Sequence, residues 1–106
     1  MADEKTQNQA LNKNEIKIEI DDQTSNGVYS NFALISHTDN EFVLDFIFVQ
    51  PQYGKAKVRT RVITTPAHAK KILLALQDNI AKYEQQFGPI KEHTINVKEA
   101  KPKFYN

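Results

Sequence analysis

Histidines and carboxylates are the side chains with which this chain of 106 residues could bind a metal ion or transfer protons. There is no cysteine, which excludes disulfides, thiolate ligands and thiol nucleophiles together. The three histidines, His37, His68 and His93, lack ligand spacing such as a pair at i, i+4 on one helix. His37 and Glu41 could form an acid–base pair, but no nucleophile or second base is fixed near them. The sequence therefore predicts a non-enzymatic protein without a metal or a cofactor.

One carboxylate, Asp45, interrupts the apolar run EFVLDFIFVQ. An ionised carboxylate removed from water is unfavourable unless it is paired. If this strand and the next one join their apolar faces, the numbers of paired residues must sum to an even number. Asp45 then shares its face with Arg59 and Arg61, and a guanidinium there can form a bidentate pair with it. We expect Asp45 to hold the register of the two strands.

Charge is unevenly distributed along the chain, although the formal net charge is only +1. Residues 1–45 contain nine acidic residues and three lysines, which gives −6, whereas residues 46–77 contain six basic residues and no acid, which gives +6. The basic residues are Lys55, Lys57, Arg59, Arg61, Lys70 and Lys71. They could bind nucleic acid or an acidic partner, or they could face the acidic half within the fold. The segment lacks the interleaved aromatic residues and glycines that stack bases.

Four segments have the pattern of β-strands and predict an antiparallel meander. They cover residues 15–20, 28–37, 41–50 and 56–65. The first alternates isoleucine with charged residues, and the others are rich in β-branched and aromatic residues. A three-residue TDN loop would place His37 opposite Glu41, with Asn40 in the left-handed conformation.

A long amphipathic helix follows the strands. Thr65 is a suitable N-cap, Pro66 suits the first helical position, and Gly88 ends the pattern. Its apolar stripe contains Ala69, Leu73, Leu76, Ile80, Tyr83 and Phe87. The fold class is therefore α+β, an antiparallel meander of about four strands with this helix packed on one face. We expect a disordered arm over 1–14, one domain over 15–90, and a flexible tail or extra edge strand over 91–106.

One helix can cover only one face of such a sheet. The other face would carry Asp45 and the arginines together with Ala33, Ile35, Val43, Ile47, Val49 and Ile63. An exposed apolar patch of this size is unusual for a monomer. We therefore expect a homo-oligomer, a dimer or tetramer joined through the sheet, with Ile47 in the contact.

These features favour a protein-binding or chaperone-like module that contacts extended polypeptide by strand addition. The alternative is a nucleic-acid-binding protein that uses the basic segment. The N-terminus has no apolar signal segment, and no stretch approaches the roughly 18 apolar residues of a membrane span. The expected location is the cytoplasm, without membrane contact.

Several motifs between Tyr29 and Ile90 resemble a small family of bacterial and archaeal proteins classed as a domain of unknown function. They are Asn31, the pair Ser36 and His37, EFVLDF from Glu41 to Phe46, Arg61, and the pattern TP.HAK...ALQ.NI..YE..FG from Thr65 to Gly88. The order of strands followed by a helix also resembles the export chaperone SecB, whose subunits bind unfolded chains and associate through their sheets. That second resemblance implies polypeptide binding by analogy of fold alone.

Overall fold

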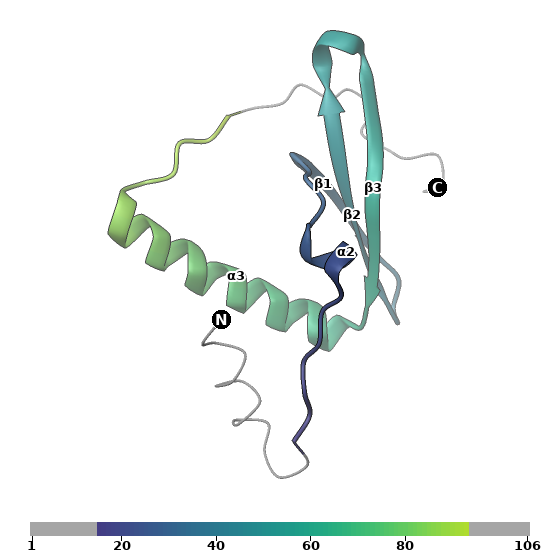
Figure 1. Ribbon diagram of the computed structural model, residues 1–106, viewed down its shortest axis with the longest axis vertical. Coiled ribbons are helices and arrows are strands. Elements are labelled where there is room, and N and C mark those ends of the chain that lie inside the picture. The colour runs from purple at the N-terminus through teal and green to yellow at the C-terminus, as the bar shows by residue number, and fades with distance from the viewer. Residues whose placement is uncertain (1–14, 94–106) are drawn as a thin grey trace.

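The structure is a computed structural model that describes residues 15–93 (Figure 1). Its elements are α2 (Asp22–Ser25), β1 (Phe32–His37), β2 (Phe42–Gln50), the 3-10 turn η2 (Pro51–Tyr53), β3 (Lys55–Thr64) and α3 (Pro66–Phe87). The strands form one antiparallel sheet in the order β1-β2-β3, so the described chain has the expected α+β class. The arm over 1–14 and most of the tail predicted over 91–106 lie outside the described residues.

The predicted strand over 15–20 is absent. Residues 15–20 form no secondary structure, and Ile16, Ile18 and Ile20 are 57%, 47% and 59% exposed. An alternating pattern shows that a segment suits a sheet, but it does not supply a neighbouring strand. In Figure 1 this purple segment runs down from α2, away from the sheet.

The hairpin between β1 and β2 closes more tightly than predicted. The Thr38 N–H donates to the Glu41 carbonyl at 2.9 Å, and the Thr38 hydroxyl accepts from the N–H groups of Asn40 and Glu41 at 3.2 and 3.1 Å. Thr38 therefore pairs with Glu41, and His37 faces Phe42 instead of Glu41. Asn40 is not left-handed, because Glu15 is the only non-glycine residue with positive φ among those described.

The register of β2 with β3 follows the even-sum rule only as far as Phe46. Paired numbers sum to 106 from Phe42–Thr64 to Phe46–Thr60, and to 105 from Ile47–Val58 onward. Arg59 is the extra residue, and it forms a β-bulge. A regular ladder would have placed its guanidinium opposite buried Ile47, and the bulge places Val58 there instead.

The sheet has two faces with different burial. The Asp45 face consists of Phe32, Leu34, Ser36, Val43, Asp45, Ile47, Val49, Ala56, Val58, Arg61 and Ile63. The Phe46 face consists of Ala33, Ile35, His37, Phe42, Leu44, Phe46, Phe48, Gln50, Lys55, Lys57, Thr60, Val62 and Thr64. The core lies on the Asp45 face of β2, where Asp45, Ile47 and Val49 are 0%, 5% and 6% exposed. On the Phe46 face, Ile35 is 62% exposed and the phenylalanines of β2 are half-buried.

Five residues lie on the face opposite to the predicted one. Ala33 and Ile35 belong to the Phe46 face, because paired residues of β1 and β2 sum to 79, an odd number. Ala56, Val58 and Lys57 also exchange faces, because the bulge at Arg59 shifts the alternation by one residue. On the Asp45 face, Asp45, Ile47 and Val49 are buried, whereas Ile63 is 56% exposed, so this face is closed over β2 and open at β3.

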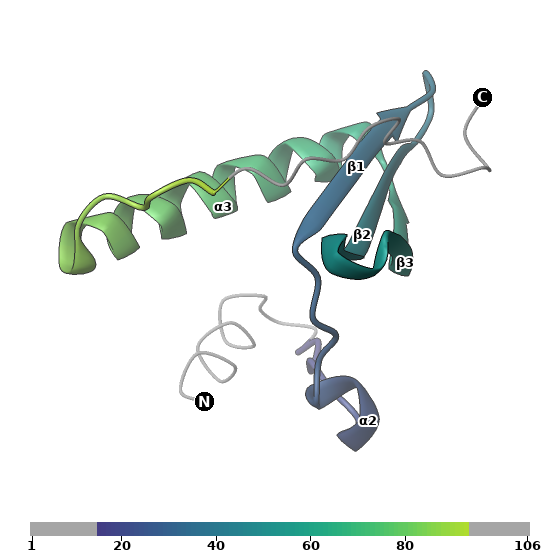
Figure 2. The same cartoon turned by 90° about the horizontal axis from the view of Figure 1, so that it is seen from above.

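Helix α3 begins and ends as predicted. The Thr65 hydroxyl accepts from the His68 N–H at 3.1 Å, Pro66 occupies the first turn, and Gly88 at φ 92° follows the last helical residue. The helix nevertheless projects away from the sheet in both views and makes no extended contact with a strand (Figures 1 and 2). The predicted packing on one face is wrong because Thr65 alone joins β3 to α3, and a helix that folds back on its sheet needs a connection of about 2–6 residues. No helix among the described residues meets the length and hydrophobicity of a bilayer span.

Candidate polypeptide-binding site

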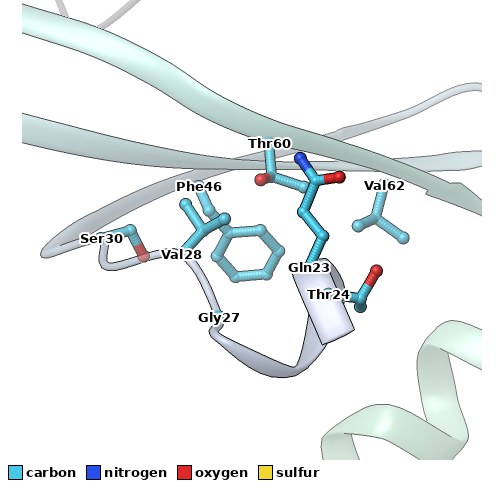
Figure 3. Close-up of a pocket in the computed structure, with 8 residues that line it drawn as sticks. All are labelled: Gln23, Thr24, Gly27, Val28, Ser30, Phe46, Thr60 and Val62. Carbon is cyan, nitrogen blue, oxygen red and sulfur yellow. The ribbon is translucent and has the colours of Figure 1, made fainter. Parts of the chain in front are cut away.

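A groove lies between the α2 segment and the Phe46 face of the sheet (Figure 3). Its volume is about 520 Å³. One wall consists of Gln23, Thr24, Gly27, Val28 and Ser30, and the other of Phe46, Thr60 and Val62. We call it the Phe46 groove.

The α2 wall is ordered by a helix cap. The Asp21 carboxylate accepts from the Thr24 N–H at 2.6 Å, and the Ser25 hydroxyl donates to the Asp22 carbonyl at 2.7 Å. Hydrogen bonds from the side chain and the backbone of Thr24 hold the pKa of Asp21 below its ordinary value of 3.8. The cap is therefore complete above that value and is lost as the pH falls through the lowered pKa. Gly27 at φ 78° then directs the chain from α2 toward the sheet.

Asn31 fastens this wall to the middle strand. Its N–H donates to the Ile47 carbonyl at 3.0 Å, its Nδ2 donates to the Val49 carbonyl at 3.1 Å, and its Oδ1 accepts from the Val49 N–H at 2.8 Å. The Asn31 amide thus continues the β1–β2 ladder beyond the end of β1. Next to it, the Tyr29 ring meets Phe48 edge to face, with ring centroids 5.8 Å apart.

The eight described residues that line the groove combine apolar side chains with neutral polar ones, and none of the eight is ionisable. Phe46, Val28 and Val62 can contact an apolar side chain, while the amide of Gln23 and the hydroxyl of Thr60 can bond to a backbone amide. A hydrophobic lining with a few polar groups is typical of a binding site. In the described part of the chain, no three histidine or carboxylate side chains come together as a metal site would require.

The Asp45 pair lies on the other side of the sheet. Arg61 Nε donates to Asp45 Oδ1 at 2.7 Å, and Arg61 Nη2 donates to Asp45 Oδ2 at 2.8 Å. Arg59 and Arg61 were the two predicted partners of Asp45. Arg61 is paired opposite Asp45, whereas Arg59 lies at the bulge. The Asp45 side chain is fully buried and the Arg61 side chain is 34% exposed. This bidentate pair joins β2 to β3 and takes no part in the groove.

Other residues predicted as interaction sites have different surroundings. The His37 ring stacks on Phe42 with centroids 5.3 Å apart, and Glu41 contributes its backbone to the hairpin. Ile47 is 5% exposed in the single chain, and its role in an oligomer contact stays a prediction. On the Phe46 face, Ile35 and Val62 are 62% and 39% exposed.

The basic residues do not form one surface. Lys55 and Lys57 lie on the Phe46 face at the η2 end of β3, while Arg61 lies on the opposite face against Asp45. Lys70 and Lys71 follow the other end of β3, about 25 Å along a strand that rises about 3.3 Å per residue. A single patch of six cations is therefore not present.

The groove was not predicted, because no helix was expected between the predicted strands over 15–20 and 28–37. The available signal was Asp21 three residues before Thr24, which is the spacing of an N-cap. Asn31 was noted as a motif residue, but no local pattern indicates that its amide bonds to Val49, 18 residues away.

The three-stranded antiparallel sheet followed by one long helix defines an α+β protein. Residues 1–92 match the model of the family described as "Protein of unknown function (DUF3467)", and the chain belongs to this family. The resemblance noted between Tyr29 and Ile90 is thereby confirmed and extended toward the N-terminus. No curated protein and no solved structure showed a significant match.

Proposed function

We propose that this protein is a non-enzymatic, chaperone-like module of the cytoplasm that binds extended polypeptide and acts as a homo-oligomer. The observation that carries the proposal is the middle of the Phe46 face, where the apolar side chains of Ile35 and Val62 are exposed beside a groove whose described lining has no charged residue. The arrangement of strands before a long helix, which led to the comparison with SecB, supports this only at the level of fold class.

The two outer edges of the sheet differ in a way that favours strand addition at β1. β1 contains no proline and no lysine, arginine or carboxylate, and no described strand pairs with its outer edge. β3 carries lysines and arginines and a bulge, which are the features that protect an edge from pairing. An extended peptide added to β1 would place alternate side chains beside Ala33 and Ile35.

That position is continuous with the groove. Ala33, Phe46 and Thr60 are neighbours in one cross-strand row, and Ile35, Leu44 and Val62 form the next row. Both rows run from the outer edge of β1 to the groove. The separation of the basic residues gives no comparable surface for nucleic acid, so the structure favours polypeptide as the ligand.

The test is fluorescence anisotropy with a labelled, reduced and carboxymethylated protein as the unfolded probe. We expect Ile35→Lys and Val62→Lys each to weaken binding about tenfold or more, because each introduces a charge beside the bound chain. Tyr53→Ser is the matched control, since Tyr53 is 66% exposed in η2 and should leave affinity unchanged. Absence of binding by the wild-type protein, or equal losses in all three variants, would refute the proposal.

A further inference from the structure

Helix α3 has an apolar seam with the spacing of a coiled coil. Successive residues of this seam are four and three apart, and they are Ala69, Leu73, Leu76, Ile80, Tyr83 and Phe87. They occupy the a and d positions of a heptad over almost the whole helix. Ile72 and Leu74 add apolar surface beside the seam in its N-terminal half, whereas from Leu76 to Phe87 the large apolar residues occupy only the a and d positions. An a and d seam suits a second helix.

The seam has no partner among the described residues. Leu73, Leu76 and Ile80 are 53%, 56% and 40% exposed, and Tyr83 and Phe87 are 51% and 65% exposed. Tyr83 and Phe87 contact each other, with ring centroids 4.9 Å apart, and α3 makes no extended contact with the sheet. We infer that α3 pairs antiparallel with α3 of a second copy. The two-fold axis crosses the seam at the height of residue 78 along the helix. This deepens the proposed function by naming the surface that builds its oligomer.

The antiparallel register places large seam residues opposite small ones. With paired numbers that sum to 156, Ala69 faces Phe87 of the second copy, Leu73 faces Tyr83, and Leu76 faces Ile80. The smallest side chain of the seam thus meets one of the largest, so the layers have similar volumes. A parallel pair would set Ala69 against Ala69 and Phe87 against Phe87, with a void in one layer and crowding in another.

Charge complementarity supports the same direction. Lys70 and Glu84 occupy equivalent flanking positions of the heptad, and the antiparallel arrangement brings Lys70 beside Glu84 of the second copy. Asp78 and Lys82 lie on the outer side of the helix and already pair with each other at 3.0 Å. The antiparallel arrangement also keeps the two sheets at opposite ends of a helix pair about 33 Å long, since each sheet precedes the N-terminus of its α3.

The area is sufficient for a stable contact. Five seam side chains at about half exposure present on the order of 500 Å² per copy, given ~150–250 Å² for an aromatic side chain. The flanking residues of a 22-residue helix add to this, and stable interfaces bury roughly 600–1,000 Å² per partner. A second copy of this chain therefore fits the seam in shape, charge and size.

The first experiment measures the mass of the full chain by analytical ultracentrifugation at micromolar concentration. We expect a dimer for the wild-type protein. For Leu76→Lys and Ile80→Lys we expect the dissociation constant of the dimer to rise at least 100-fold, so that the monomer predominates. Leu74→Lys is the matched control, because Leu74 is 56% exposed on the same helix but lies off the seam, so its dimer should persist. A monomeric wild-type protein, or equal dissociation by Leu74→Lys, would overturn the inference.

A charge exchange tests the direction. Lys70→Glu should weaken the dimer, and the double variant Lys70→Glu with Glu84→Lys should restore it, because both cross-helix pairs return with exchanged signs. Glu84→Gln controls for the hydrogen bond that Glu84 accepts from the Ile90 N–H at 2.9 Å. Residues 70 and 84 are about 21 Å apart along one helix, so rescue cannot arise within a copy or in a parallel pair. Failure of the double variant to regain the dimer would overturn the antiparallel register.

The two proposals fail separately. If seam variants become monomeric while the wild-type protein does not bind the unfolded probe, the interface stands and the proposed function falls. If the probe binds to a wild-type monomer, the interface falls and the polypeptide-binding part of the proposed function stands.

Discussion

At the scale of single residues, the burial of Asp45 shows how a sheet can hold a charge in its core. The carboxylate is fully buried, and the Arg61 guanidinium meets both of its oxygens at 2.7 and 2.8 Å. Two parallel charge-assisted hydrogen bonds fix direction as well as distance. A slip of β3 by one residue would move Arg61 to the other face, so the pair also opposes wrong registers.

Replacing Asp45 with Asn keeps the shape of the side chain and removes the charge that Arg61 faces. We expect a loss of about 3–5 kcal/mol in the free energy of unfolding, because a buried pair that loses one partner leaves the other unbalanced. Urea denaturation followed by circular dichroism gives the value.

Asp78→Asn is the control for this change. Its carboxylate belongs to an exposed i, i+4 pair with Lys82, and its loss should cost only about 0.3–0.5 kcal/mol. A double-mutant cycle of Asp45→Asn with Arg61→Gln should show strong coupling, and the same cycle with Arg59→Gln should show none. Equal coupling to both arginines would argue against the register described.

At the scale of elements, the bulge at Arg59 decides which side chains of β3 reach the core. It brings Val58 opposite Ile47 and leaves Arg59 outside the regular ladder. Lys55 and Lys57 consequently lie on the Phe46 face, and Ala56 lies on the Asp45 face. One inserted residue therefore reverses the orientation of half of the strand.

Val58 and Arg59 should respond oppositely to substitution. Val58→Lys would place a charge beside buried Ile47 and should cost at least about 2 kcal/mol of unfolding free energy. Arg59→Ala should change it by no more than about 0.5 kcal/mol, as for surface positions in general. Chemical denaturation compares the two, and a large loss in Arg59→Ala with a neutral Val58→Lys would indicate a regular ladder.

The features that were predicted correctly depend on near neighbours in the sequence. The limits of α3 follow from Thr65, Pro66 and Gly88, and the Asp45 to Arg61 pair follows from the period of two strands joined by a short turn. The position of α3, the missing strand at 15–20 and the groove depend on connection lengths and on distant bonds such as that of Asn31. The periodicity of a local segment does not indicate any of these three features. The face predicted for Ala33 and Ile35 was wrong because the prediction assumed a three-residue loop between β1 and β2. The actual loop is one residue shorter, and this reverses the faces of β1 relative to β2.

At the scale of the whole molecule, binding to nucleic acid depends on where the basic residues lie more than on the net charge. The net charge is +1, and the six basic residues of 46–77 are divided between two faces of the sheet and a helix. Arg61 is bonded to Asp45. Within the described part of the chain, these six residues therefore form no single surface that could follow a phosphate backbone.

We accordingly expect weak, salt-sensitive binding to nucleic acid. Anisotropy with labelled duplex and single-stranded DNA should give dissociation constants no tighter than the ~10⁻⁴–10⁻⁶ M of non-specific binding near physiological salt. Substituting Lys70 and Lys71 together with Ala should change little. Tight binding that depends on sequence would favour the nucleic-acid alternative over polypeptide binding.

The separation of α3 from the sheet has a kinetic consequence. The three strands are joined by short turns and can form within one chain, and hairpins form in roughly 1–10 μs. Among the described residues, the 22-residue helix α3 has no extended contact with the sheet. Because most of the stability of a helix comes from packing of its apolar face, α3 depends on an encounter with a second molecule. Refolding should then proceed in two stages, a fast one independent of protein concentration and a slower one that accelerates with it. The time between the stages, when seam residues are exposed to solvent, is the period in which the chain is most susceptible to proteolysis and to association with the wrong partner.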